Sequence, residues 1–259
     1  MQHLLLTTPT GEKIHARIDY PDGGTPSKIV LIAHGLAGYK EEPLIANIRD
    51  VYLKNDTAAV TYDARFSLGQ SGGPLEKACF THFIQDLEFM VSWIRTSPDF
   101  KNASLALSGH SLGAGACLYY AAHHADIKHL SLFSTVYNGN MLAASYEKHK
   151  PGFMAQWRAD KVLQRTHPVT GKSGGISYNH MSDAAKYELE KQSGQITCPV
   201  LIVYGSRDIS STHEINTILF NSLHAPKKMI EIIGGNHTFS DEKSMADIKE
   251  GLNAWINRI

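Results

Sequence analysis

The stretch from Leu105 to Leu118 reads LALSGHSLGAGACL and joins a run of apolar residues to a run of small ones. The first half predicts a buried strand and the second half a helix, with a turn between them at GHSLG, residues 109–113. Glycines on either side of Ser111 allow a turn so tight that the hydroxyl stands clear of the sheet. Such a strand–turn–helix is typical of a nucleophilic serine.

Short β-branched runs alternate with helical stretches along the rest of the chain, which predicts an α/β fold with a mostly parallel central sheet flanked by helices. We expect strands at residues 28–33, 58–62, 104–108, 129–133, 200–204 and 229–233. We expect helices at residues 43–55, 81–96, 112–124, 211–223 and 241–259. The N-terminal stretch predicts a hairpin about Pro9-Thr10-Gly11 rather than a signal peptide, because it has no basic n-region.

Length and composition narrow the class of protein. A chain of 259 residues with 42% hydrophobic residues can bury a sizeable core within one domain, residues 1–259. The 25 basic and 25 acidic residues balance, which argues against a nucleic-acid partner. No apolar run approaches the roughly 20 residues of a membrane span. Cys79, Cys117 and Cys198 lie far apart, so we expect reduced thiols and a cytoplasmic protein; a homodimer is left open.

The alternation of strand and helix patterns breaks between about residues 136 and 195. We interpret this segment as a small cap inserted over one end of the sheet, with a loop-like stretch at residues 166–180 and a helix at 181–192. An excursion that never contacts a ligand is the alternative. If the segment is a cap, its apolar side chains would line the substrate pocket, and the candidate substrate-binding residues are Met141, Phe153 and Trp157.

A serine hydroxyl is a poor nucleophile and needs a base, normally a histidine oriented by a carboxylate. Asp208 follows the expected strand VLIVY, and His237 follows MIEII. Sites in α/β sheets lie outside the carboxyl ends of the strands, so Ser111, Asp208 and His237 are expected to meet there as a catalytic triad. Their order along the chain, Ser then Asp then His, also fits.

Acyl transfer also needs donors for the developing oxyanion. The stretch AHGLAGYKEE would turn the backbone after the first buried strand, so that the amide of Leu36 faces the site beside the amide of Leu112. His34 is interpreted as an orienting residue. The segment DARFSLGQSGG, residues 63–73, lacks the Gly-Lys-Ser/Thr of a phosphate loop and is interpreted as scaffold. No histidine pair has a third ligand at metal-site spacing, so we expect no metal and no cofactor.

The segments HGLAG, DARFSLGQSGG, GHSLGA, YGSRD and GGNHTF together resemble the α/β-hydrolase superfamily over nearly the whole chain. Within it, the chain is similar to the serine-aminopeptidase-like S33 group, which includes bacterial cinnamoyl and feruloyl esterases. The resemblance implies the same triad and oxyanion amides. Two departures are Phe66-Ser67-Leu68 before Gly69, and GHSLGA where cinnamoyl esterases usually have GHSQGG.

The sequence therefore predicts a cofactor-independent serine hydrolase that cleaves small-molecule carboxylic esters through an acyl-enzyme, a carboxylesterase in broad class. The nearest alternatives are the hydrolysis of thioesters, of lipids or of small peptides by the same triad. A ligand-binding protein that has kept the fold without catalysis is the alternative from another class, because fold alone does not fix function.

Overall fold

The computed structural model describes residues 1–22, 26–166 and 171–259. Its main sheet has eight strands in the order β1-β2-β4-β3-β5-β6-β9-β10. The six strands from β4 to β10 in that order are parallel, and β1 and β2 add an antiparallel hairpin at one edge. The strands are β1 (Gln2–Thr7), β2 (Lys13–Asp19), β3 (Lys28–Ala33), β4 (Ala58–Tyr62), β5 (Ser104–His110), β6 (Leu130–Phe133), β9 (Val200–Gly205) and β10 (Lys227–Ile232).

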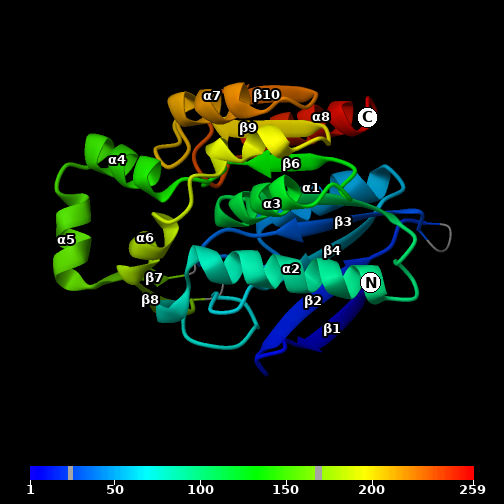
Figure 1. Cartoon of the computed structure of the whole chain (residues 1–259), viewed down its shortest axis with the longest axis horizontal. Coiled ribbons are helices and arrows are strands. Elements are labelled where there is room, and N and C mark those ends of the chain that lie inside the picture. Colours follow the sequence, from blue (N-terminus) through cyan, green and yellow to red (C-terminus); the bar gives the residue numbers. More distant parts are fainter. Residues whose placement is uncertain (23–25, 167–170) are drawn as a thin grey trace.

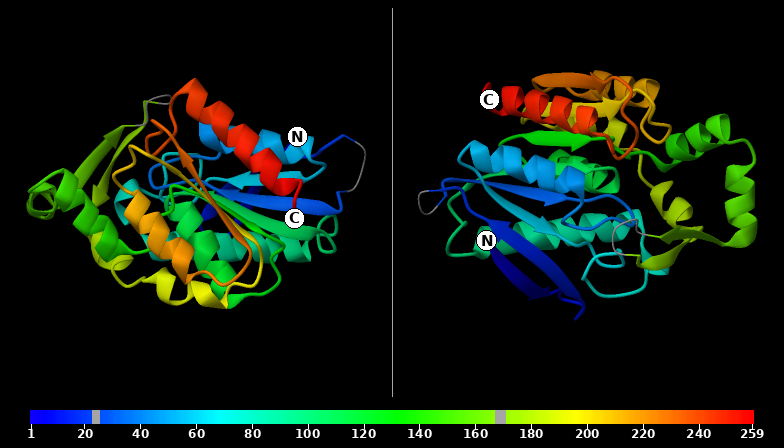
Figure 2. Two further views of the ribbon diagram at one scale, coloured as in Figure 1. Left: turned by 90° about the horizontal axis from the view of Figure 1, so that it is seen from above. Right: turned by 180° about the vertical axis from the view of Figure 1, so that it is seen from behind.

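Helices cover both faces of this sheet (Figures 1 and 2). One face carries α1 (Pro43–Lys54) and α8 (Glu242–Ile256), and the other carries α2 (Phe80–Thr96), α3 (Leu112–His123) and α7 (His213–Ser222). The central strand β3 shows why, since Leu31 packs into one core cluster and Val30 and Ile32 into the other. A strand buried on both faces reads as a continuous apolar run.

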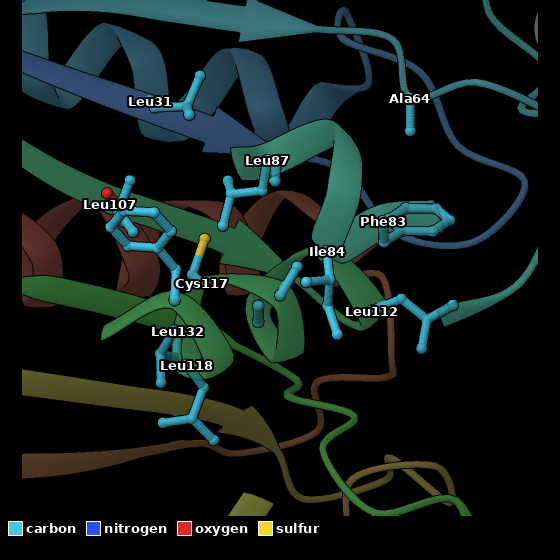
Figure 3. Close-up of a cluster of buried hydrophobic side chains, with 14 of the residues drawn as sticks. Leu31, Ala64, Phe83, Ile84, Leu87, Leu107, Leu112, Cys117, Leu118 and Leu132 are labelled. Carbon is cyan, nitrogen blue, oxygen red and sulfur yellow. The ribbon is translucent and has the colours of Figure 1, made fainter. Parts of the chain in front are cut away.

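The helix α3 lies close against the sheet and against α2. Figure 3 shows Leu87 of α2 beside Cys117 of α3, with Ile84 of α2 also on the side of α3, all three buried. Small residues in the first turns of α3 permit this approach, because a Cβ at Gly115 would lie 2.7 Å from the Phe80 ring of α2 and 2.1 Å from the carbonyl oxygen of Val136. The helix that begins at the serine turn is therefore fixed in position by the core.

The strands and helices expected outside residues 136–195 are present, with ends that differ by up to three residues, as is usual at fraying termini. The N-terminal hairpin is confirmed as β1 and β2. All three cysteines are free, with Cys117 and Cys198 buried and Cys79 half-buried. None of the described helices combines the length and the apolar character that crossing a membrane requires.

The segment between β6 and β9 forms a separate group of elements beyond the carboxyl ends of the parallel strands (Figure 1). Its elements are α4 (Gly139–His149), α5 (Phe153–Asp160), β7 (Val162–Thr166), β8 (Ser173–Ser177), α6 (Asn179–Ala184) and two 3₁₀ turns, η2 (Leu189–Lys191) and η3 (Ser193–Gln195). We call residues 139–195 the insertion. Within the described part of the chain, strands β7 and β8 pair only with each other, in antiparallel orientation.

Two expectations for the insertion were wrong. The stretch 166–180, expected to be a loop, contains β8; residues 167–170 of it lie outside the described residues. Its glycines serve close packing, since a Cβ at Gly175 would lie 2.1 Å from the Val162 side chain. The single helix expected at 181–192 is also absent from the described structure, where α6 ends at Ala184. Glu188 instead forms a β-bridge with Asn138, which requires extended backbone.

Candidate active site

Ser111 occupies the turn between β5 and α3 in a strained conformation, with φ 55° and ψ −118°. A positive φ is costly for a residue other than glycine and persists only where the surroundings enforce it. The residues at positions 109 and 113 must be glycine, because neighbouring backbone atoms lie too close for a Cβ. A Cβ at Gly109 would lie 2.6 Å from the amide nitrogen of Ala114, and one at Gly113 would lie 2.4 Å from the carbonyl oxygen of His34.

The structure brings the three expected side chains together. The His237 ring places Nε2 3.0 Å from Oγ of Ser111 and Nδ1 2.8 Å from Oδ2 of Asp208. The other Asp208 oxygen accepts hydrogen bonds from the amides of Ser210 (2.7 Å) and Ser211 (3.1 Å). Since Nδ1 donates to the carboxylate, Nε2 is the nitrogen that is left to accept the serine proton.

The carboxyl group of Asp208 is held ionised. Burial alone would raise its pKa, but the attraction of His237 and the hydrogen bonds from His237 and Ser210 outweigh burial and lower the pKa below its ordinary value. The His237 side chain is 29% exposed, while that of Asp208 is fully buried. The site thus combines a buried carboxylate, that of Asp208, with an imidazole, that of His237, which solvent can partly reach.

Leu36 and Leu112, whose amides are the expected oxyanion donors, both lie beside Ser111. Leu112 is the first residue of α3, so its N–H has no acceptor within the helix. The backbone before Leu36 abuts the serine, because a Cβ at Gly35 would lie 2.9 Å from Cβ of Ser111. Both leucines line the same cavity as Ser111.

His34 is placed to hold the loop that carries Leu36. Its Nδ1 donates to the carbonyl oxygen of Gly35 at 2.7 Å, and its Nε2 accepts from the amide of Ala64 at 2.9 Å. Burial lowers the pKa of His34, so the ring is neutral in this tautomer. The geometry fits the orienting role expected from the sequence, since neither ring nitrogen bonds to Ser111.

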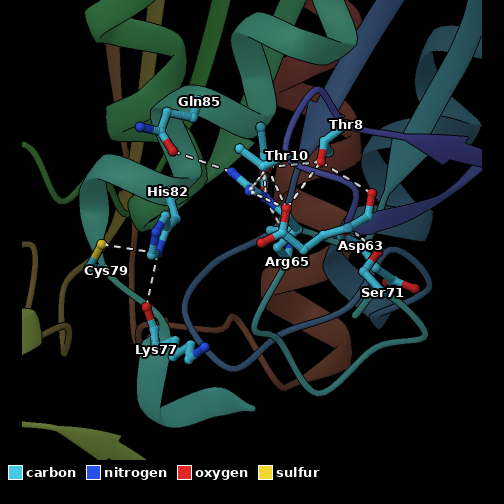
Figure 4. Close-up of polar contacts among 12 residues, drawn as sticks. Thr8, Thr10, Asp63, Arg65, Ser71, Lys77, Cys79, His82 and Gln85 are labelled. Atoms are coloured by element: carbon cyan, nitrogen blue, oxygen red, sulfur yellow. Dashed lines mark hydrogen bonds and ion pairs between the residues drawn. The ribbon is translucent and has the colours of Figure 1, made fainter. Parts of the chain in front are cut away.

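The loop after β4 carries a network of buried polar contacts (Figure 4). Asp63 pairs with Lys40 at 2.8 Å, and both side chains are 1% exposed. Arg65 donates from Nε to Asp86 at 2.5 Å. Ser71 donates to the carbonyl oxygen of Asp63 at 2.5 Å. These contacts fit a scaffold role, because the polar groups of the loop are used in internal bonds.

A cavity of about 250 Å³ opens above Ser111, between the sheet and the insertion. Ser111, Leu112 and His237 form its floor. The insertion contributes Leu142, Tyr146, Trp157, Leu163, Arg165, Ile176, His180 and Met181 to its walls. Most of these side chains are apolar, so the cavity suits an apolar group attached to the reacting carbonyl.

Of the three residues expected to contact substrate, Trp157 is the one that lines this described cavity. Met141 lies on another face of α4 and lines a groove toward α7. Phe153 packs behind the wall, with its ring 5.4 Å from that of Tyr146 and 6.0 Å from that of Trp157. The α4 residues that reach the cavity are Leu142 and Tyr146, one helical turn apart.

His180 is a polar residue of this wall that the sequence did not single out. It is 2% exposed, and its Nδ1 has no hydrogen-bond partner within the described part of the chain. Burial lowers the pKa of His180 to about 4, so the ring is neutral. Its ring stacks on Trp157 at a centroid distance of 6.4 Å. His180 ends a glycine-rich stretch with the composition of a loop, so nothing in the sequence indicated that its side chain would line a cavity.

A model of the family described as serine aminopeptidase, S33, matches residues 24–244, which is most of the chain. The chain belongs to this family. No curated protein matches it. Its likeness to solved structures extends over whole chains, and all of those compared below lie at or under 20% identity, where the likeness shows the fold.

Est1E from Butyrivibrio proteoclasticus with bound ferulic acid is 20% identical, with a TM-score of 0.79, over 100% of this chain and 98% of that one. The esterase domain of a Rhodothermus marinus protein is 19% identical, with a TM-score of 0.71, over 99% and 98%. Mouse alpha/beta hydrolase domain-containing protein 10 is 15% identical, with a TM-score of 0.76, over 100% and 99%. The α/β-hydrolase fold expected from the sequence is confirmed, and esterases are among its structural neighbours.

Proposed function

We propose that this S33-family protein is a serine hydrolase that cleaves small-molecule carboxylic esters through an acyl-enzyme. The observation that carries the proposal is the position of His237, with Nε2 3.0 Å from Ser111 and Nδ1 2.8 Å from Asp208. This is the distance range in which a general base takes a proton from a nucleophile. The residues proposed to act directly are Ser111, His237 and Asp208.

In the proposed reaction, Nε2 of His237 removes the hydroxyl proton as Ser111 attacks the ester carbonyl. The amides of Leu36 and Leu112 stabilise the oxyanion, a contribution of roughly 2.7–4 kcal/mol for one donor in a comparable hydrolase. His237 then protonates the departing alcohol, and later activates the water that releases the acid. Asp208 fixes the tautomer of His237 and stabilises its protonated form.

The insertion is proposed to act as a cap over the acyl group, within a single domain of residues 1–259. The apolar walls of the 250 Å³ cavity favour a small apolar acyl group. Feruloyl and cinnamoyl esters belong in the first substrate panel, because the similar Est1E was solved with ferulic acid bound. Thioesters, lipids and small peptides stay as alternatives, because the same machinery serves them.

The first experiment is labelling with a fluorophosphonate probe, followed by mass spectrometry of the peptide that contains Ser111. We expect one adduct at Ser111 and none in Ser111→Ala, with p-nitrophenyl acetate hydrolysis lost in the variant and its fold unchanged by circular dichroism. Turnover retained in Ser111→Ala would reject the nucleophile. Ligand binding without labelling would favour a non-catalytic protein.

A further inference from the structure

The insertion contributes one permanently charged side chain, that of Arg165, to the cavity above Ser111. The same residue lines a second cavity, of about 350 Å³, between the loop that follows β3 and the loop that follows β10. Leu36 and Thr238 also line both cavities. Arg165 therefore stands where the two cavities meet, in company with a hydroxyl side chain and close to the reacting serine.

The guanidinium of Arg165 is available to a ligand. Arg165 lies on β7, its backbone pairs with Gly174 of β8, and its side chain is exposed. Within the described residues, this side chain makes no hydrogen bond and no ion pair. A guanidinium carries five N–H donors and a positive charge that it keeps at any physiological pH. These donors are left to water or to a bound molecule.

The charge of Arg165 acts on the wall of the first cavity. Tyr146 lines this cavity, and burial raises the pKa of its hydroxyl. A hydrogen bond from Ser210 and the positive charge of Arg165 both work against burial and lower that pKa. The guanidinium is thus close enough to Tyr146 for its field to be felt at the cavity wall.

The acidic side chain nearest to this arrangement does not neutralise it. Glu42 lines the second cavity, and burial, followed by the charge of Asp63, raises the pKa of its carboxyl from 4.5 to about 7. The carboxyl is therefore largely uncharged in slightly acidic solution. Arg165 is not among the groups whose charge shifts this pKa, so the two side chains act separately.

A carboxylate is the anion that a single guanidinium matches best. The two groups are planar and form two parallel N–H···O bonds. A phosphate carries up to two charges and calls for further cations, but Arg165 is the only lysine or arginine among the described residues that line either cavity. The apolar neighbours Leu36 and Leu163 strengthen such a pair, because a ligand that fills the cavity displaces water and lowers the local dielectric constant.

We propose that Arg165 binds a carboxylate of the substrate, so that the preferred substrates are small esters that carry a free carboxylate beside the ester group. The assignment rests on the proposed serine-esterase function. The carboxylate belongs to either half of the ester, since Arg165 borders both cavities. The first cavity, of about 250 Å³, limits the part of the substrate bound there to a short chain.

Two pairs of esters test the proposal, each with an anionic member and a neutral amide of nearly the same shape. Monomethyl glutarate and its amide, methyl glutaramate, place the group on the acyl half. 4-Acetoxybutanoate and 4-acetoxybutanamide place it on the alcohol half. The measured quantity is the ratio of kcat/KM for the anionic member to that for the neutral one. We expect a ratio of about five or more in at least one pair, the upper end for an ion pair that solvent reaches.

Substitutions of Arg165 should change this ratio in a graded way. Arg165→Gln should lower it to about one, and Arg165→Glu should lower it further because it repels the anion. Arg165→Lys keeps the charge but loses the planar fork, so it should retain part of the preference. The matched control is Lys161→Gln, which removes a positive charge from the residue directly before β7 and lines neither described cavity. It should keep the wild-type ratio.

Binding of glutarate, measured by calorimetry, gives a readout that does not need turnover, and it should weaken about fivefold in Arg165→Gln. If Ser111 is labelled and esters turn over, but Arg165→Gln keeps both wild-type ratios, the carboxylate assignment is wrong and the esterase proposal stands. An equal loss in Lys161→Gln would also overturn the assignment, because the general charge of the insertion would then suffice.

If Ser111 is not labelled and no ester turns over, the esterase proposal fails. Glutarate binding then decides the fate of the carboxylate site by itself. Equal binding by wild type and Arg165→Gln rejects the site, and weaker binding by the variant upholds it.

Discussion

The His110 imidazole donates a hydrogen bond from Nε2 to the backbone carbonyl oxygen of His237, at 2.8 Å. Because His110 directly precedes Ser111, this bond ties the serine turn to the loop that carries the proposed base. The two imidazole rings lie 5.0 Å apart, at 49° to each other. Burial lowers the pKa of His110 to about 3, so the ring stays neutral and keeps this donor geometry at physiological pH.

Replacing His110 by phenylalanine should lower kcat about tenfold or more. The hydrogen bond that holds the His237 loop is then lost, so Nε2 of His237 moves away from Oγ of Ser111. Substrate binding in the apolar cavity should change little, so KM should stay within about threefold. His110→Gln retains an N–H donor and should recover much of the lost kcat. Steady-state kinetics with p-nitrophenyl acetate measures both parameters. Full activity in His110→Phe would mean that the bond has no role in positioning His237.

Asp208→Asn should lower kcat by several orders of magnitude, by analogy with the roughly 10⁴-fold loss when the triad aspartate of a serine protease is replaced by asparagine. The amide would favour the wrong tautomer of His237 and could not stabilise its protonated form. Fluorophosphonate labelling rates and kcat should fall together. A loss below tenfold would show that another carboxylate serves. Asp241→Asn, which alters only the N-cap of α8, is the matched control.

The candidate site was predictable where its residues sit at fixed positions relative to strands. Asp208 and His237 each follow a parallel strand, and the ends of such strands meet at one edge whatever the rest of the fold does. The cavity wall was not predictable in this way. Whether Met141 or Leu142 of α4 faces the serine depends on the rotation of that helix about its axis, which is set by packing against the core and against α5 and α6. The sequence did indicate Trp157 as a residue that lines the cavity, because a side chain of this size tends to be buried.

The insertion was also hard to predict for a physical reason. The Ser173–Ser177 strand has the composition of a loop, because the packing of Gly174 against Leu75 and of Gly175 against Val162 leaves no room for a Cβ. Close tertiary packing thus selects the residues that local propensity assigns to turns.

Lys40→Met should destabilise the protein by about 3–5 kcal/mol, the usual cost of leaving one partner of a buried ion pair alone. Both Lys40 and Asp63 are 1% exposed, and Lys40 also donates to Gln70 at 2.8 Å. Urea unfolding measures the loss. Lys148→Met provides the control, because its pair with Glu214 is exposed on both sides and should contribute less than about 1 kcal/mol. Equal midpoints for the two variants would contradict the prediction.

Glu42 should make the folded state less stable as the pH rises from about 4.5 to 7. Burial, followed by the charge of Asp63, raises the pKa of its carboxyl from 4.5 to about 7. Between these values the folded protein keeps a proton that the unfolded chain releases, so unfolding becomes easier with increasing pH. The full effect corresponds to roughly 3 kcal/mol.

Glu42→Gln removes this titration and should flatten the pH dependence of the unfolding free energy over that interval, while gaining stability relative to wild type at pH 7. Urea unfolding at pH 4.5, 5.5 and 7 measures both effects. Glu41→Gln is the matched control, since Glu41 is the exposed neighbour on the same turn and its replacement should leave the slope as it is. If Glu42→Gln and wild type lose stability in parallel, the proton is held by another group.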